Sequence, residues 1–158
     1  EKRMQKGGAE GESAKSLPGR VAIASAREAY QIYKEIFHGE RFRSLAEKGA
    51  AMQRVLWAST STKNPAYADL KYVEPLIGPE TINTLPPETI DAYRDHGNPA
   101  RQLEEGLDEA RNVMRRLPGT GIDIDAVTRQ LEEEGIEKFN KPYDSLMKTL
   151  DEKRRQMA

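Results

Sequence analysis

Cysteine is absent from this chain, and apolar residues are scarce. Without cysteine, the 158 residues can form neither a disulfide nor a thiolate metal site. Hydrophobic residues make up 37% of the chain and aromatic residues 6%, and no apolar run approaches the roughly 20 residues that span a bilayer. We therefore expect a cytoplasmic protein that has no membrane partner.

An excess of one charge is also lacking. The 25 lysines and arginines nearly balance 26 aspartates and glutamates, which leaves a formal net charge of −1. Such a chain has no net field that would attract nucleic acid or an anionic membrane. The two histidines, His38 and His96, have no second histidine or carboxylate at metal-ligand spacing. We predict no nucleic-acid partner, no metal site and no cofactor.

The first 18 residues differ in composition from the rest. Residues 1–18 are rich in glycine, serine and charge and have no apolar periodicity, which predicts a flexible lead-in or loop. Residues 19–158 are expected to form the folded domain. No initiator methionine precedes Glu1 and no signal pattern follows it, so we expect the sequence to start inside a longer protein.

Apolar residues recur at three- and four-residue spacing along most of the chain. This periodicity predicts helices over residues 20–38, 40–48, 67–77, 86–97, 103–117, 125–134 and 136–150. Gly135 is expected to separate the last two helices, and Pro142 to interrupt the last one. Tyr30 and Tyr33 lie in the first apolar stripe, so we expect them in the core.

Short apolar runs without helical spacing lie between these helices. Residues 54–59 predict a strand buried on both faces, with Trp57 packed in the core. Residues 81–84 predict a second strand, and residues 119–124 a short third one. Strands that alternate with helices pair in parallel, in a doubly wound sheet or a barrel. A β/α barrel takes about 250 residues, so this α/β chain would supply only part of one.

A polar, cationic loop follows the first predicted strand. Ligands of α/β proteins bind at the carboxyl ends of parallel strands, and here Ser59–Thr62 carry four consecutive hydroxyls before Lys63. Hydroxyls and one cation suit a phosphate or a polyol. Composition alone favours a plainer interpretation, in which local hydroxyl hydrogen bonds stabilise a turn and the lysine is solvated.

A longer pattern extends from this loop almost to the end of the chain. Its parts are Leu56–Tyr67 (LWASTSTKNPAY), Tyr72–Glu74, Leu76–Pro79, Thr81–Pro86 (TINTLP), Asp95–Gly97, Gly121–Asp123 and Leu131–Phe139 (LEEEGIEKF). The pattern resembles transaldolase, and more specifically the longer-chain bacterial and cyanobacterial subgroup. Because several separate segments match, the resemblance does not depend on one motif.

The resemblance implies the C-terminal part of a (β/α)8 TIM barrel, helix-rich, with strands six to eight and two or three parallel strands in this chain. It also implies transfer of a dihydroxyacetone unit through a lysine Schiff base in the pentose phosphate pathway. Sedoheptulose 7-phosphate and glyceraldehyde 3-phosphate would give erythrose 4-phosphate and fructose 6-phosphate.

The family's Schiff-base lysine and acid–base carboxylates lie on earlier strands than those matched here. We therefore expect no catalytic residue in this chain, which should be inactive alone. The resemblance implies two kinds of partner, sugar-phosphate substrates and the N-terminal part of the barrel.

Four residues of this sequence match substrate-binding positions of the family. Ser59 matches a serine that hydrogen-bonds substrate, and Lys63 matches a basic phosphate-binding position that is arginine in other subgroups. Arg101 matches either a second phosphate-binding cation or a helix-start arginine that faces solvent. Asn83, with Thr84 beside it, either lines the pocket or caps the following helix.

Two other interpretations compete with this one. The chain could be a non-enzymatic helical interaction domain whose apolar stripes at 20–37 and 100–117 bind partners. It could also belong to another Schiff-base aldolase on the same barrel, which the breadth of the match disfavours.

Overall fold

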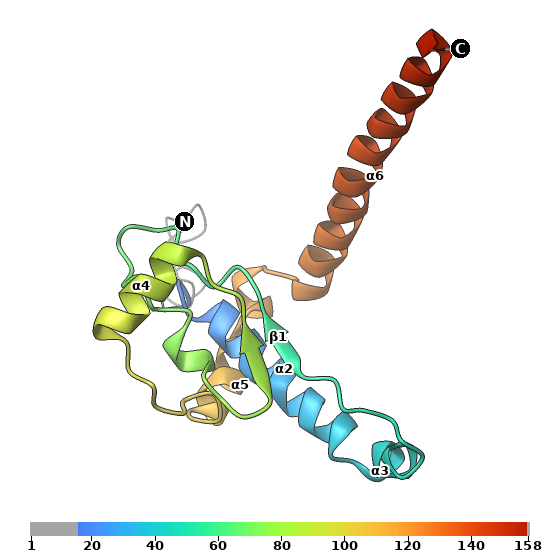
Figure 1. The fold of residues 1–158 in the computed structure, drawn as a ribbon. Coiled ribbons are helices and arrows are strands. Elements are labelled where there is room, and N and C mark those ends of the chain that lie inside the picture. The colour runs from blue at the N-terminus through green and yellow to red at the C-terminus, as the bar shows by residue number, and fades with distance from the viewer. Residues whose placement is uncertain (1–15, 158) are drawn as a thin grey trace. The chain divides into compact units, whose positions relative to one another are not determined.

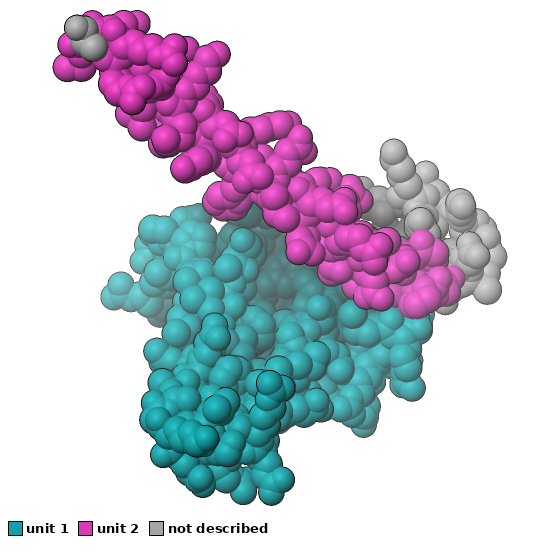
Figure 2. Space-filling view, turned by 90° about the vertical axis from the view of Figure 1, so that its right-hand side faces the viewer, with its two compact units in different colours: residues 1–116 teal, residues 117–158 magenta. Residues whose placement is uncertain are grey.

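The computed structural model describes residues 16–157, which fall into two compact units, one up to residue 116 and the other from residue 117 onward (Figures 1 and 2). Of the predicted lead-in, residues 1–15 lie outside the described residues. Leu17, near its end, is buried. Among the described helices, none is both long and apolar enough to cross a membrane.

The first unit begins with two helices that the periodicity predicted. Helix α2 spans Val21–Phe37, and α3 spans Glu40–Ala46 (Figure 1). Tyr30 and Tyr33 on α2 are buried, as expected from their spacing. After α3, Gly49 adopts a φ of +91°, which glycine reaches at little cost.

A two-stranded parallel sheet follows. Strand β1 spans Val55–Trp57 and pairs in register with β2, Thr81–Asn83. One face of β1 packs toward α2 through Val55 and Trp57. The predicted burial of both faces is wrong within the described residues, because Leu56, between them, is 54% exposed.

The core of the first unit joins α2 to segments far along the chain. Its buried centre contains Tyr30, Tyr33, Leu76 and Leu103. The two tyrosine rings stack with centroids 5.8 Å apart. Trp57 packs against this centre and donates its indole N–H to the Leu76 carbonyl at 3.1 Å. The tryptophan thus packs against the core as expected, although it is only partly buried.

The helix predicted over 67–77 is not formed. Residues 65–73 make a series of turns, and only a short 3₁₀ helix, η1 (Glu74–Leu76), follows. The Thr62 hydroxyl donates to the carbonyls of Ala68 and Asp69, at 3.0 and 3.1 Å. Pro75, inside the predicted range, has no N–H to donate and disfavours a helical backbone at the residue before it.

Helices α4 (Pro87–His96) and α5 (Leu107–Arg116) complete the first unit. Helix α4 ends before Gly97, as predicted. Helix α5 begins later than the predicted start at Leu103, and Leu103 packs into the core from the turn that precedes the helix. Helices α2 and α5 contact each other. The stripes at 20–37 and 100–117, which the interaction-domain interpretation assigns to partners, are therefore largely used inside this unit.

The second unit contains the 3₁₀ helix η2 (Pro118–Thr120) and the 34-residue helix α6 (Ile124–Met157). The strand predicted over 119–124 is wrong, because Pro118 opens η2 and Gly121, with φ +69°, ends it. Asp123, not Asp125, caps α6 by accepting two backbone N–H groups. The predicted break at Gly135 is also wrong, because α6 continues through both Gly135 and Pro142.

Candidate functional site

The chain leaves β1 in an unusual conformation. Ser59, two residues after the strand, has a left-handed backbone with φ +59° and is exposed. Thr60 turns inward and is only 5% exposed. Its hydroxyl donates to Oδ1 of Asn83 at 2.8 Å, which links the carboxyl ends of the two strands.

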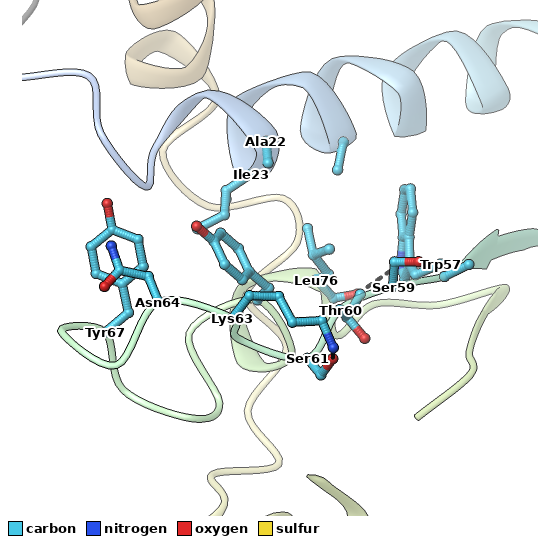
Figure 3. Close-up of a pocket in the computed structure, with 13 residues that line it drawn as sticks. Ala22, Ile23, Trp57, Ser59, Thr60, Ser61, Lys63, Asn64, Tyr67 and Leu76 are labelled. Atoms are coloured by element: carbon cyan, nitrogen blue, oxygen red, sulfur yellow. Dashed lines mark hydrogen bonds between the residues drawn. The ribbon is translucent and has the colours of Figure 1, made fainter. Parts of the chain in front are cut away.

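A pocket of about 430 Å³ lies between α2 and this loop (Figure 3). Figure 3 shows Ala22 and Ile23 of α2 on one side and the segment from Ser59 to Asn64 on the other. Its lining also includes Tyr67 and Tyr72. The pocket thus combines a hydroxyl-rich rim with an apolar wall.

Lys63 supplies a cation at the polar rim. Its ammonium lies 2.8 Å from the Ser61 hydroxyl, and its side chain is exposed. Ser59 and Ser61 line the same pocket, and so does Thr60, whose hydroxyl already donates to Asn83. An ammonium beside hydroxyl groups can bind a phosphate oxygen while the hydroxyls bind the carbon-bound oxygens of a polyol.

The four residues carried over from the resemblance are not all brought together. Ser59 and Lys63 both line the pocket. Asn83 is not among the lining residues, but its side chain accepts the hydrogen bond of Thr60, which is. Arg101 is exposed in the loop after α4 and also lies outside the lining. Their substrate-binding roles stay predictions.

Sequence reasoning missed the aromatic wall of the pocket. The rings of Tyr67 and Tyr72 meet edge to face, with their centroids 6.4 Å apart. Burial is the main cause that raises the pKa of the Tyr72 hydroxyl, and the charge of the neighbouring Tyr67 is the second. The Lys71 ammonium lies 4.5 Å from the centre of the Tyr67 ring. Helical spacing assigned Tyr67 to a helix face, so its place in a turn beside the pocket could not be read from that pattern.

A side chain at Gly19 would disturb this wall. Gly19 has φ +72°, and a Cβ there would lie 2.5 Å from the Lys71 side chain and 3.0 Å from the Tyr67 ring. In the sequence, the sign of this close contact is a glycine directly after the predicted lead-in and just before the first helix. No role was predicted for that glycine.

Both histidines lie beside carboxylate groups outside the pocket. His96, at the end of α4, lies 3.2 Å from both Asp69 and Asp95. The hydrogen bond to Asp69 is the largest cause that raises the pKa of His96, and the hydrogen bond to Asp95 is the next. The same hydrogen bond with His96 lowers the pKa of Asp69. His38 lies 2.8 Å from Glu80. Within residues 16–157, no group of three or more acidic, histidine or cysteine side chains is arranged to hold a metal.

Comparison with known proteins places this chain in a family. Residues 2–150 match the model of the family described as transaldolase/fructose-6-phosphate aldolase. The chain is 52% identical over 140 residues to the transaldolase of Trichodesmium erythraeum, which covers 87% of this chain and 37% of that protein.

Two further relatives agree with this match. Transaldolase 2 of Nostoc punctiforme is 49% identical over 141 residues (88% of this chain, 37% of that protein), and the transaldolase of Thiobacillus denitrificans is 51% identical over 132 residues (84% and 37%). The chain thus spans a little over a third of the length of these relatives. The resemblance read from the residues is confirmed, and the chain belongs to the transaldolase/fructose-6-phosphate aldolase family.

Proposed function

We propose that this chain forms the phosphate- and polyol-binding part of a transaldolase active site. The complete barrel would transfer a dihydroxyacetone unit between sugar phosphates, through a Schiff base on a lysine that this chain does not contain. The observation that carries the proposal is the pocket at the end of β1, where the Lys63 ammonium lies 2.8 Å from the Ser61 hydroxyl and Ser59 lines the same pocket.

The chemistry of this pocket suits binding more than covalent catalysis. A Schiff-base lysine must lose its proton to attack a carbonyl, so it is usually desolvated or placed beside another cation. Lys63 is exposed and lies beside a hydroxyl, with no second cation among the described residues that line the pocket. Its charge is therefore suited to a phosphate, and we assign it that role.

The rest of the barrel is the partner that this proposal requires. Strands β1 and β2 make a two-stranded sheet within the described residues, and Leu56 of β1 is 54% exposed. Further strands at this sheet would cover such a face in a barrel. We assign the reaction to a reducing cytoplasm, which the absence of cysteine supports.

Binding of fructose 6-phosphate to this chain tests the role of Lys63. Replacing Lys63 by methionine should weaken binding about tenfold to a hundredfold, since a charged hydrogen bond contributes about 1.5–3 kcal/mol. Lys63→Arg should keep most of the affinity. Lys48→Met is the matched control, because Lys48 is an exposed lysine outside the pocket lining. Titration calorimetry or NMR shift mapping gives the affinities.

Borohydride reduction with fructose 6-phosphate tests where the covalent chemistry lies. We expect no stable adduct on this chain. A reduced adduct on any of its lysines, located by mass spectrometry, would refute the assignment of the Schiff base to residues outside it.

A further inference from the structure

The conformation of Ser59 needs support from its surroundings. A residue with a Cβ adopts a φ near +59° uncommonly, and such a backbone persists only where neighbouring contacts hold it. Ser59 itself is exposed, so packing of its own side chain does not supply that support.

Hydrogen bonds from the end of β2 hold the chain on both sides of Ser59. Before it, the Trp57 carbonyl accepts the backbone N–H of Thr84 at 3.0 Å and the Thr84 hydroxyl at 3.1 Å. After it, the Thr60 hydroxyl donates to Oδ1 of Asn83 at 2.8 Å. The three residues from Ala58 to Thr60 therefore have little freedom to rearrange.

The sequence allows three roles for Asn83, and the structure distinguishes between them. It does not cap α4, because the N-cap residue is Pro86 and no side chain caps that helix. It does not line the pocket, whereas its partner Thr60 does. What it does is accept the hydrogen bond of a buried hydroxyl.

We propose that Asn83 is a positioning residue, which holds Thr60 and thereby presents the Ser59 hydroxyl to the sugar phosphate instead of binding the substrate itself. The inference rests on the proposed function, because it takes the Ser59–Lys63 loop as the substrate-binding segment. Thr84 acts on the same loop from the other side, through Trp57.

A double-mutant cycle tests whether Asn83 acts through Thr60. Thr60→Val and Asn83→Leu should each weaken fructose 6-phosphate binding about fivefold to tenfold, and the double variant should lose no more than either single one. Thr60→Ser keeps the hydroxyl and should stay within about twofold of the parent. If Asn83 touches the substrate, the two losses multiply and the proposal is overturned.

A measurement without ligand separates this inference from the proposed function. The three-bond coupling between the amide and Hα protons of Ser59 reports its φ. It should change in Thr60→Val and Asn83→Leu and stay unchanged in Thr60→Ser. An unchanged coupling in Asn83→Leu overturns the positioning role, even if the parent chain binds no fructose 6-phosphate.

A second variant guards against loss of folding. Asn83→Asp keeps an acceptor oxygen for Thr60, so the Ser59 coupling should match that of the parent. If Asn83→Leu does not fold, a changed coupling in Asn83→Asp contradicts the proposal.

Discussion

The first unit and helix α6 show the same apolar periodicity but differ in what it does. In the first unit, the stripe of α2 places Tyr30 and Tyr33 in a core with Leu76 and Leu103. In α6, none of the residues is buried, and Phe139 and Tyr143 are 82% and 62% exposed. In these two regions periodicity identifies the helix, while burial depends on what other segments supply.

Local side-chain pairs support α6 instead. Glu134 accepts from Gln130 at 2.7 Å and from Lys138 at 3.2 Å, and these hydrogen bonds lower its pKa. Lys141 pairs with Glu137, and Asp151 pairs with both Arg154 and Arg155. Exposed pairs at this spacing contribute only about 0.2–0.5 kcal/mol each, so the two regions should respond very differently to substitution.

The same truncation should have very different effects in the two regions. Leu103→Ala removes a fully buried side chain from the core, so it should lower the free energy of unfolding by about 2–5 kcal/mol. Leu146→Ala changes a side chain that is 56% exposed and should cost under about 0.5 kcal/mol. Urea unfolding of both variants, followed by circular dichroism, measures the difference.

The control is a second pair of positions. Leu76→Ala should behave like Leu103→Ala, and Leu150→Ala like Leu146→Ala, since their exposures are similar within each pair. Equal losses at Leu103 and Leu146 would mean that α6 is packed as tightly as the core.

Residues whose role is local were predictable from the sequence. The α2 stripe, the glycine after α4 and the strand before Ser59 follow from spacing and turn chemistry, and the structure confirms them. The turns of 65–73 were predictable only in part, because Pro75 stands inside the predicted helix and lacks the N–H that a helix interior needs, whereas the hydrogen bonds of the Thr62 hydroxyl to two carbonyls have no signal in the sequence. Leu70 and Val73 are buried there without helical structure.

The candidate site also contains residues that the sequence predicts and residues that it does not. Ser59 and Lys63 follow directly from the end of an apolar strand, and both line the pocket. Tyr67 and Tyr72 reach it through irregular turns, which no simple period describes. The hydrogen bond between Thr60 and Asn83 joins residues 23 apart in sequence, so only the pairing of β1 with β2 reveals it.

Replacing the proline inside α6 should strengthen that helix. Pro142 removes an intrahelical hydrogen bond and crowds the preceding turn, so Pro142→Ala should stabilise the helix locally by up to about 3 kcal/mol. Amide hydrogen exchange of the residues around position 142 should slow accordingly. Core amides of the first unit should exchange at unchanged rates.

Gly135 provides the matched, smaller substitution in the same helix. A Cβ at Gly135 meets no atom within 4 Å, so Gly135→Ala should stabilise α6 by about 1 kcal/mol through backbone entropy. If neither substitution slows exchange, the helix already frays at these positions, and the contrast with the core is larger than the structure indicates.

The smallest expected effect concerns the ion pair that joins α4 to the turn segment of the first unit. The pKa of His96 is raised above its ordinary 6.5 and that of Asp69 is lowered below its ordinary 3.8. A raised histidine pKa contributes stability fully below 6.5 and loses it as the pH rises through the folded-state value. A lowered aspartate pKa contributes fully above 3.8 and loses it as the pH falls through its folded-state value.

The pair therefore stabilises the unit most between pH 3.8 and 6.5. Asp69→Asn should lower the pKa of His96 more than Asp95→Asn does, because the hydrogen bond to Asp69 is the larger cause. NMR titration of the His96 ring proton gives both shifts. The melting temperature should fall slightly between pH 6 and 8 in the parent and less in Asp69→Asn, because that variant has already lost the ion pair. Equal pH dependence in the two proteins would show that this exposed pair adds nothing to the fold.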